Sequence, residues 1–301
     1  MARRKSGKVR TSRAYRTFTV CNTAFLILLC FVMIFPVYKV FVTSVTTVGE
    51  YYSSPLVLWP KEFTWDSYKY IFSTGEVVSA LGVTVFTTVV GTFLSMAFTL
   101  MMAYALSKRF VPGSHVVHRI LLITMFLDSG LIPFYLMVKN LGLNNTVWSS
   151  IIPSLISLWN YLVIRSFFLE LPSALEEAAL IDGASWWQIF VRVVLPLSMP
   201  VVATFTLFYA VDYWNTWYNC MIFNTNKELQ TLQLMLYRII VANESNWSMQ
   251  EAYAAQSGMR NTYTEGIKMA CCVVATVPIL CVYPFLQQYF VTGVMLGSVK
   301  G

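Results

Sequence analysis

Charged residues are scarce in this sequence. Only 12% of its 301 residues are Asp, Glu, Lys or Arg, whereas 57% are hydrophobic. A soluble domain usually carries about 25% charged residues, and a single soluble core does not need so much apolar sequence. The scarcity of charge therefore predicts a protein that uses the lipid bilayer as its solvent.

Several motifs that carry chemistry are also missing. The chain has no Gly-x-x-x-x-Gly-Lys-Ser/Thr phosphate-binding loop and no His-Glu-x-x-His, so we do not expect it to hydrolyse ATP or to be an enzyme. Its six cysteines lack the paired spacing of a zinc site, and they do not indicate a disulfide framework. His115 and His118 lie in a basic connection and predict no metal site. We therefore expect no cofactor and no metal on this chain.

Long apolar stretches are what the sequence has instead. About 20 helical residues cross about 30 Å of hydrocarbon, and six stretches are long and apolar enough. They predict membrane spans at 18–42, 77–106, 119–139, 147–168, 194–222 and 266–290. Several spans contain proline, which membrane helices tolerate when neighbouring groups satisfy the freed backbone. We expect an all-α membrane protein with six transmembrane helices.

Basic residues predict the orientation of these spans. Seven of the 21 Lys and Arg residues lie in the first 16 positions, without any acidic residue. Such a run also occurs in nucleic-acid-binding arms, but directly before an apolar stretch it predicts a cytoplasmic anchor and no nucleic acid. We expect residues 1–17 to be a basic cytoplasmic tail, 18–290 the six-helix transmembrane domain, and 291–301 a cytoplasmic C-terminal tail.

The connections between spans then alternate between the two sides of the membrane. The inner ones are 107–118 and 169–193, and the outer ones are 43–76, 140–146 and 223–265. The first inner connection is flanked by basic residues and holds no acid, whereas 43–76 has two lysines against four acids. This distribution agrees with the excess of Lys and Arg that cytoplasmic loops carry.

The polar stretch 172–196 has the signals of a short helix. Ser173 and Glu176 have the spacing of a capping box, which predicts a helix start. Glu176 and Glu177 fall in the first turn, where negative charge suits the helix dipole. Gly183 can end the helix in a left-handed conformation. Ser185 can cap a second short turn after it.

The same stretch leads into the next span at Leu195-Pro196, because proline is accepted in the first helical turn. On capping chemistry alone, an ordinary surface connection between two spans explains the stretch equally well. The small side chains of Ala178 and Ala179 add one more property, since they would let another surface approach the backbone closely.

The full pattern resembles the coupling loop of the membrane subunits of binding-protein-dependent ABC importers. The residues that carry the resemblance are Glu177-Ala178-Ala179, Gly183, Val193 and Leu195-Pro196. Val193 stands where that family often has Ile, which is a mild departure. The segments 130–135, 141–143, 209–215 and 283–301 are similar to carbohydrate-uptake permeases related to MalG, of the LplC/YtcP type.

The resemblance implies the type I ABC importer permease fold, with both termini cytoplasmic, in a bacterial cell membrane. It also implies a second, non-identical permease, an ABC ATPase dimer that binds ATP and Mg, and an extracellular solute-binding protein or lipoprotein. The cargo would be a sugar, with an oligosaccharide favoured. The residues it assigns to ATPase coupling are Glu176, Glu177, Ala178, Ala179, Asp182, Gly183, Leu195 and Pro196.

Polar residues inside the apolar stretches are candidates for a substrate path, because charge in a membrane usually faces a cavity or a partner. A sugar site needs hydrogen-bonding groups and flat aromatic faces, and 212–219 offers both, with Asp212, Asn215 and Asn219 on one helical face. Interfacial aromatic residues and helix-joining polar residues explain the cluster equally well. The candidates are Asp128, Asn160, Tyr161, Asp212, Trp214, Asn215, Tyr218 and Asn219.

Two other functions remain to be separated from this one. A stand-alone secondary transporter or channel would use Asp128 and Asp212 as ion sites, although two mid-span acids are few for a proton relay. An intramembrane enzyme would need a catalytic arrangement that the sequence does not show. The outer segment 223–265 is interpreted either as a contact with the solute-binding protein or as a solvated loop.

Overall fold

The fold is helical throughout the part of the chain that the computed structural model describes, which is residues 13–54, 56–73, 75–108, 110–127, 129–240 and 262–296; within these residues, β-pairing is limited to an isolated bridge between Thr46 and Phe63. The longer helices are α1 (Arg13–Ser44), α4 (Glu76–Ser107), α5 (Ser114–Met125), α6 (Leu131–Asn140), α8 (Leu158–Glu170), α12 (Met199–Trp214) and α16 (Thr264–Leu296). The shorter ones are α2 (Val48–Ser53), α3 (Asp66–Ser73), α7 (Trp148–Ile151), η1 (Ile152–Ser154), α9 (Ser173–Ile181), α10 (Trp186–Ile189), η2 (Phe190–Val194), α11 (Leu195–Leu197), α13 (Tyr218–Phe223), η3 (Lys227–Leu229) and α14 (Leu232–Ile240).

Three helices in the described part are long and apolar enough to cross a membrane: Tyr15–Ser44, Glu76–Ser107 and Thr264–Cys281. Two bent pairs raise the number to five if each pair forms one span. These are Trp148–Ser154 with Leu158–Glu170, bent by 47°, and Trp186–Leu197 with Met199–Trp214, bent by 85°. The protein is therefore an all-α membrane protein with three to five candidate spans.

Three of the predicted spans are divided in the structure. The stretch 147–168 is split, because η1 ends at Ser154 and α8 begins at Leu158. The stretch 119–139 is not one helix, because α5 ends at Met125 and α6 begins at Leu131, after Gly130 with a φ of 75°. The stretch 194–222 is also divided, because α12 ends at Trp214 and α13 starts at Tyr218. By contrast, α4 matches the predicted span 77–106 to within one residue at each end.

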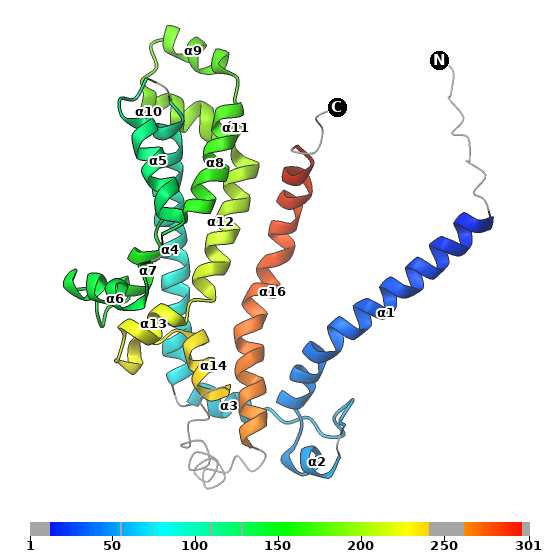
Figure 1. Cartoon of the computed structure of the whole chain (residues 1–301). Coiled ribbons are helices and arrows are strands. Elements are labelled where there is room, and N and C mark those ends of the chain that lie inside the picture. The colour runs from blue at the N-terminus through cyan, green and yellow to red at the C-terminus, as the bar shows by residue number, and fades with distance from the viewer. Residues whose placement is uncertain are drawn as a thin grey trace.

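The core of the bundle lies where α4, α8 and α12 pack against one another, and α16 joins them along α12 (Figure 1). The contact between α4 and α12 depends on small residues of α4. The Tyr213 ring packs directly on Gly91, and its hydroxyl lies 2.8 Å from Ser95 Oγ. One turn further on, Thr99 Oγ1 and Tyr209 OH form another 2.8 Å hydrogen bond. Small residues let membrane helices approach closely, and hydrogen bonds then join them.

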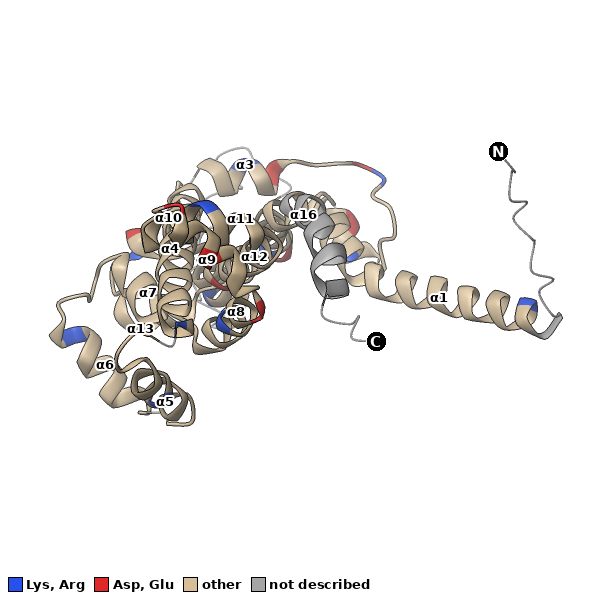
Figure 2. Cartoon of the chain, turned by 90° about the horizontal axis from the view of Figure 1, so that it is seen from above, with Lys and Arg blue, Asp and Glu red and all other residues tan. Residues whose placement is uncertain are grey.

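Helix α1 leans away from this bundle and contacts α16 (Figure 1). Its large apolar side chains are exposed, and Phe18 and Phe31 are each 67% exposed. Seen from above, the charged residues of the described helices are few, and α1 has a long uncharged stretch between Arg16 and Lys39 (Figure 2). An apolar helical surface of this length needs lipid or another membrane helix to cover it.

Candidate functional site

The connection between α8 and α12 forms a separate cap at one end of the bundle, with α9 as its outermost element (Figure 1). Helix α9 begins at Ser173 and Pro172 is its N-cap, without a side-chain cap. The predicted capping box of Ser173 and Glu176 is therefore wrong. The capping box is absent because the Glu176 carboxylate pairs with Lys108 instead of accepting a hydrogen bond from the backbone at the start of α9.

The C-terminal end of α9 confirms the role predicted for Gly183. Its φ is 82°, and its N–H donates to Leu180 O at 3.0 Å. The Ala184 N–H donates to Ala179 O, also at 3.0 Å. These two bonds form a Schellman motif, which ends a helix and satisfies its last carbonyl groups. Gly183 therefore sets the direction in which the chain leaves α9.

The second predicted turn is also present, as α10. Ser185 Oγ accepts from the Gln188 N–H at 3.4 Å, and Gln188 Oε1 accepts from the Ser185 N–H at 2.8 Å. This reciprocal pair is a capping box. The chain continues through the π-helix η2 into α11, where Pro196 lies. The prediction that Leu195-Pro196 opens the next span is wrong, because α11 ends at Leu197 and the long helix α12 begins at Met199 after an 85° bend. Leu195 is half-buried and packs against the core, so it does not lie on the outer surface with α9.

The predicted coupling residues on α9 face in two directions. Glu177, Ala178 and Asp182 are exposed, whereas Ala179 is half-buried against the core. The Glu176 side chain is only 13% exposed. The exposed surface of α9 and its C-cap therefore presents two carboxylates, Glu177 and Asp182, beside the small residue Ala178.

Sequence reasoning missed one residue of this surface, Ile181, which is 86% exposed. It follows Glu177 by four positions and so shares its face of the helix. An apolar residue four positions after an acid on a short polar connection was the signal that could have found it. An exposed acid next to an exposed large apolar side chain is a composition suited to a protein contact.

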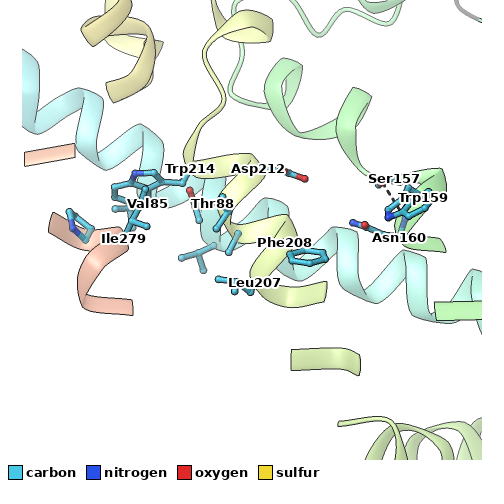
Figure 3. Close-up of a pocket in the computed structure, with 14 residues that line it drawn as sticks. Val85, Thr88, Ser157, Trp159, Asn160, Leu207, Phe208, Asp212, Trp214 and Ile279 are labelled. Atoms are coloured by element: carbon cyan, nitrogen blue, oxygen red, sulfur yellow. Dashed lines mark hydrogen bonds between the residues drawn. The ribbon is translucent and has the colours of Figure 1, made fainter. Parts of the chain in front are cut away.

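A cavity of about 740 Å³ opens between α4, α8, α12 and α16. Its wall is mostly apolar, with a few polar groups from α8 and α12. Figure 3 shows Asp212 between the rings of Trp214 and Trp159, with Asn160 beside Trp159. The other lining residues are Val85, Thr88, Val89, Ser157, Leu207, Phe208, Ala210, Val211, Pro278 and Ile279.

Three of the predicted substrate-path residues meet at this cavity: Asn160, Asp212 and Trp214. Asn160 is only 4% exposed, and its Nδ2 has no hydrogen-bond partner within the described residues. Trp214 is held in place by a hydrogen bond from its Nε1 to Ala275 O at 3.2 Å. Trp159, which is 61% exposed, lines the same cavity and was missed, although its position next to Asn160 was a usable signal.

The remaining candidates lie elsewhere. Tyr161 is fully buried, and its hydroxyl lies 3.0 Å from His118 Nδ1. Asn215 Nδ2 donates to Val211 O at 2.9 Å, and Asn219 Nδ2 donates to Ser154 Oγ at 3.1 Å. Because α12 ends before Asn215, the predicted helical face shared by Asp212, Asn215 and Asn219 is wrong.

The two candidates that remain are Tyr218 and Asp128. Tyr218 is exposed at the start of α13 and is not among the residues that line the cavity. Asp128 lies outside the residues that the structure describes, as does 241–261 of the predicted outer segment.

Membrane-length helices around a cavity, joined by a capped surface connection, form the architecture of a permease subunit. The family model for the binding-protein-dependent transport system inner membrane component matches residues 1–295, and this chain belongs to that family. It is therefore a non-catalytic, multi-pass permease component of the cytoplasmic membrane. The family predicted from the sequence is confirmed.

The relatives cover nearly the whole chain. The chain is 40% identical over 297 residues to Protein LplC of Bacillus subtilis (strain 168). That match covers 97% of this chain and 98% of LplC. The chain is 39% identical over 286 residues to the polygalacturonan/rhamnogalacturonan transport system permease protein YtcP of the same organism, at 95% and 99% coverage.

A solved structure agrees with the fold. A chain from the crystal structure of a bacterial ABC transporter involved in the import of the acidic polysaccharide alginate matches with a TM-score of 0.86 and 29% sequence identity. The match covers 94% of this chain and 100% of that chain.

Proposed function

We propose that this chain is one half of the pore of an ATP-driven ABC importer for carbohydrate, with an oligosaccharide as the favoured cargo. A second permease would complete the pore, an ATPase dimer would bind α9, and an extracellular binding protein would deliver the sugar. The observation that carries the proposal is that the same bundle has an exposed α9 connection at one end and a cavity between its helices. The names of YtcP and of the alginate importer support carbohydrate as the cargo.

The proposed topology places α9, the basic tail 1–17 and the C-terminal tail 291–301 in the cytoplasm. Figure 1 supports this arrangement, because the start of α1, α9 and the end of α16 lie at the same end of the molecule. Residues 223–240 of the predicted outer segment lie at the opposite end, where η3 and α14 pack against α4. Six crossings require α5 and α6 together to form one broken span.

Within the cavity, we assign the sugar path to Asn160, Asp212, Trp159 and Trp214. The unpaired Asn160 amide and the Asp212 carboxylate supply hydrogen-bonding groups, and the two indole rings supply apolar faces for the C–H surface of a sugar ring. A buried polar group without a partner is costly, so a sugar hydroxyl that reached the buried Asn160 Nδ2 would fill an unused donor. Asn215 and Asn219 are left out because their amides already join local elements.

The proposed function is tested by measuring which energy source drives sugar uptake. The complex of both permeases and the ATPases is placed in liposomes with sugar-loaded binding protein outside. Uptake is then measured with ATP inside, and separately with a proton or sodium gradient. Uptake that requires ATP and binding protein supports the importer. Uptake by this chain alone that follows a gradient would show a secondary transporter instead.

The carboxylate of Asp212 provides a test of the sugar path. Asp212→Asn keeps the shape of the side chain and removes its charge. We expect uptake at limiting sugar-loaded binding protein to fall about tenfold, because a hydrogen bond to a charged group contributes about 1.5–3 kcal/mol. Asn219→Ala serves as the control, since its amide is bonded to Ser154 outside the cavity. If both variants transport like the wild type, Asp212 serves subunit packing and not the path.

A further inference from the structure

One ion pair connects the α9 cap to the transmembrane bundle. Lys108 Nζ lies 2.5 Å from Glu176 Oε2, and the two residues are 68 positions apart. By comparison, the pairs Lys69–Asp66 and Lys268–Glu265 each join residues three positions apart on one helix. Lys108 and Glu176 therefore form a long-range contact and not a local surface pair.

This ion pair is largely withdrawn from water and lies against an aromatic ring. The Lys108 and Glu176 side chains are only 15% and 13% exposed. Lys108 Nζ also lies 4.6 Å from the centroid of the Tyr104 ring, in a cation–π contact. The Phe110 and Trp186 rings lie 4.5 Å apart and join the chain after α4 to α10. A paired charge in such surroundings is hard to separate, because each partner would be left buried and unpaired.

The ion pair lies at the end of the helix that forms a wall of the cavity. Lys108 directly follows α4 and is its C-cap. More than five turns away along the same unbroken helix, Val85, Thr88 and Val89 line the cavity. Beyond them, Thr84 Oγ1 accepts from the Leu232 N–H of α14 at 2.8 Å. One helix of 32 residues therefore connects the α9 cap, the cavity and α14.

We propose that the Lys108–Glu176 ion pair transmits the movement of α9 to α4, and that both are positioning residues for coupling. This inference rests on the proposed function. When a bound ATPase displaces α9, the ion pair makes α4 follow, and α4 moves the cavity wall. Glu176 thus differs from Glu177, which is exposed on the outer face of α9 and is free to meet a partner. Energetic coupling between two distant sites is carried by packed side chains, ion pairs and rigid helices of this kind.

The experiment exchanges the two charges and measures sugar transported per ATP hydrolysed. Complexes in liposomes, with sugar-loaded binding protein, carry Lys108→Glu, Glu176→Lys or both. We expect each single variant to retain the ATPase but to lower the ratio about tenfold, the size of a typical coupling between sites. The double variant should recover at least half of the wild-type ratio, because it restores an ion pair of the opposite order. Glu177→Lys is the control, and Lys108→Glu should not rescue it.

Each result decides the proposal. Single variants with the wild-type ratio would overturn it, and so would a double variant no better than the single ones. If the single variants fail to assemble, recovery of assembly and ratio in the double variant supports the proposal, and its absence overturns it. Lys108→Arg keeps the charge and should keep the ratio. ATP-independent uptake by the wild type would overturn the proposed function itself, which the charge exchange does not test.

Discussion

Replacement of Glu177 with Ala is expected to abolish the stimulation of ATP hydrolysis by sugar-loaded binding protein. The reason is its position, since Glu177 is exposed on α9 beside Ala178 and in line with Ile181. A carboxylate on such a surface would pair with a basic residue of the ATPase. Loss of one partner from a buried, hydrogen-bonded charge pair costs at least about 2 kcal/mol, which is about thirtyfold in affinity.

The measurement compares ATP hydrolysis by the purified complex with and without sugar-loaded binding protein, together with the amount of ATPase that co-purifies. Glu170→Ala is a matched control, because Glu170 is also exposed and lies at the end of α8, just before the α9 connection. Full stimulation in Glu177→Ala would show that α9 is only a capped surface helix. An equal loss in both variants would indicate a general charge effect and not a contact at α9.

Local chemistry explains why the α9 connection was predictable. Gly183 ends α9, and Ser185 starts α10, through bonds to residues no more than five positions away. Such signals are contained in a short window of sequence. The capping box at Ser173 failed because the carboxylate it needed, that of Glu176, is bound by Lys108 from another helix. A competing partner 68 positions away leaves no local signal.

In the bundle and the cavity, too, some features were predictable from the sequence and others were not. The length and apolar composition of α4 were sufficient to predict its bounds. The break between α5 and α6 and the end of α12 at Trp214 were missed, because an apolar stretch can contain a turn without losing its composition. Of the predicted path, Asn160, Asp212 and Trp214 do meet, although they come from two helices whose relative position depends on tertiary packing.

The other large effect is expected at Gly91, in the middle of α4. A Cβ atom added at Gly91 would lie 2.8 Å from two ring atoms of Tyr213, well inside normal contact distance. The ring would have to move, and it is held on both sides. The Tyr213 hydroxyl lies 2.8 Å from Ser95 Oγ and donates to Ile151 O at 3.2 Å. Tyr213 is only 2% exposed, so the core leaves it no free direction.

Gly91→Ala should therefore destabilise the protein by about 1–3 kcal/mol, the usual cost of overfilling a packed core. Gly82→Ala on the same helix is the matched control, because a Cβ there meets nothing within 4 Å. In that position alanine should be neutral or slightly stabilising, since it favours the helix. Thermal unfolding of the two variants in the same detergent measures the difference. Equal Tm values would mean that Tyr213 shifts freely and that Gly91 does not fix the approach of α4 and α12. A lower Tm in Gly91→Ala alone would show that this close contact holds together α4 and α12, two of the helices that line the cavity.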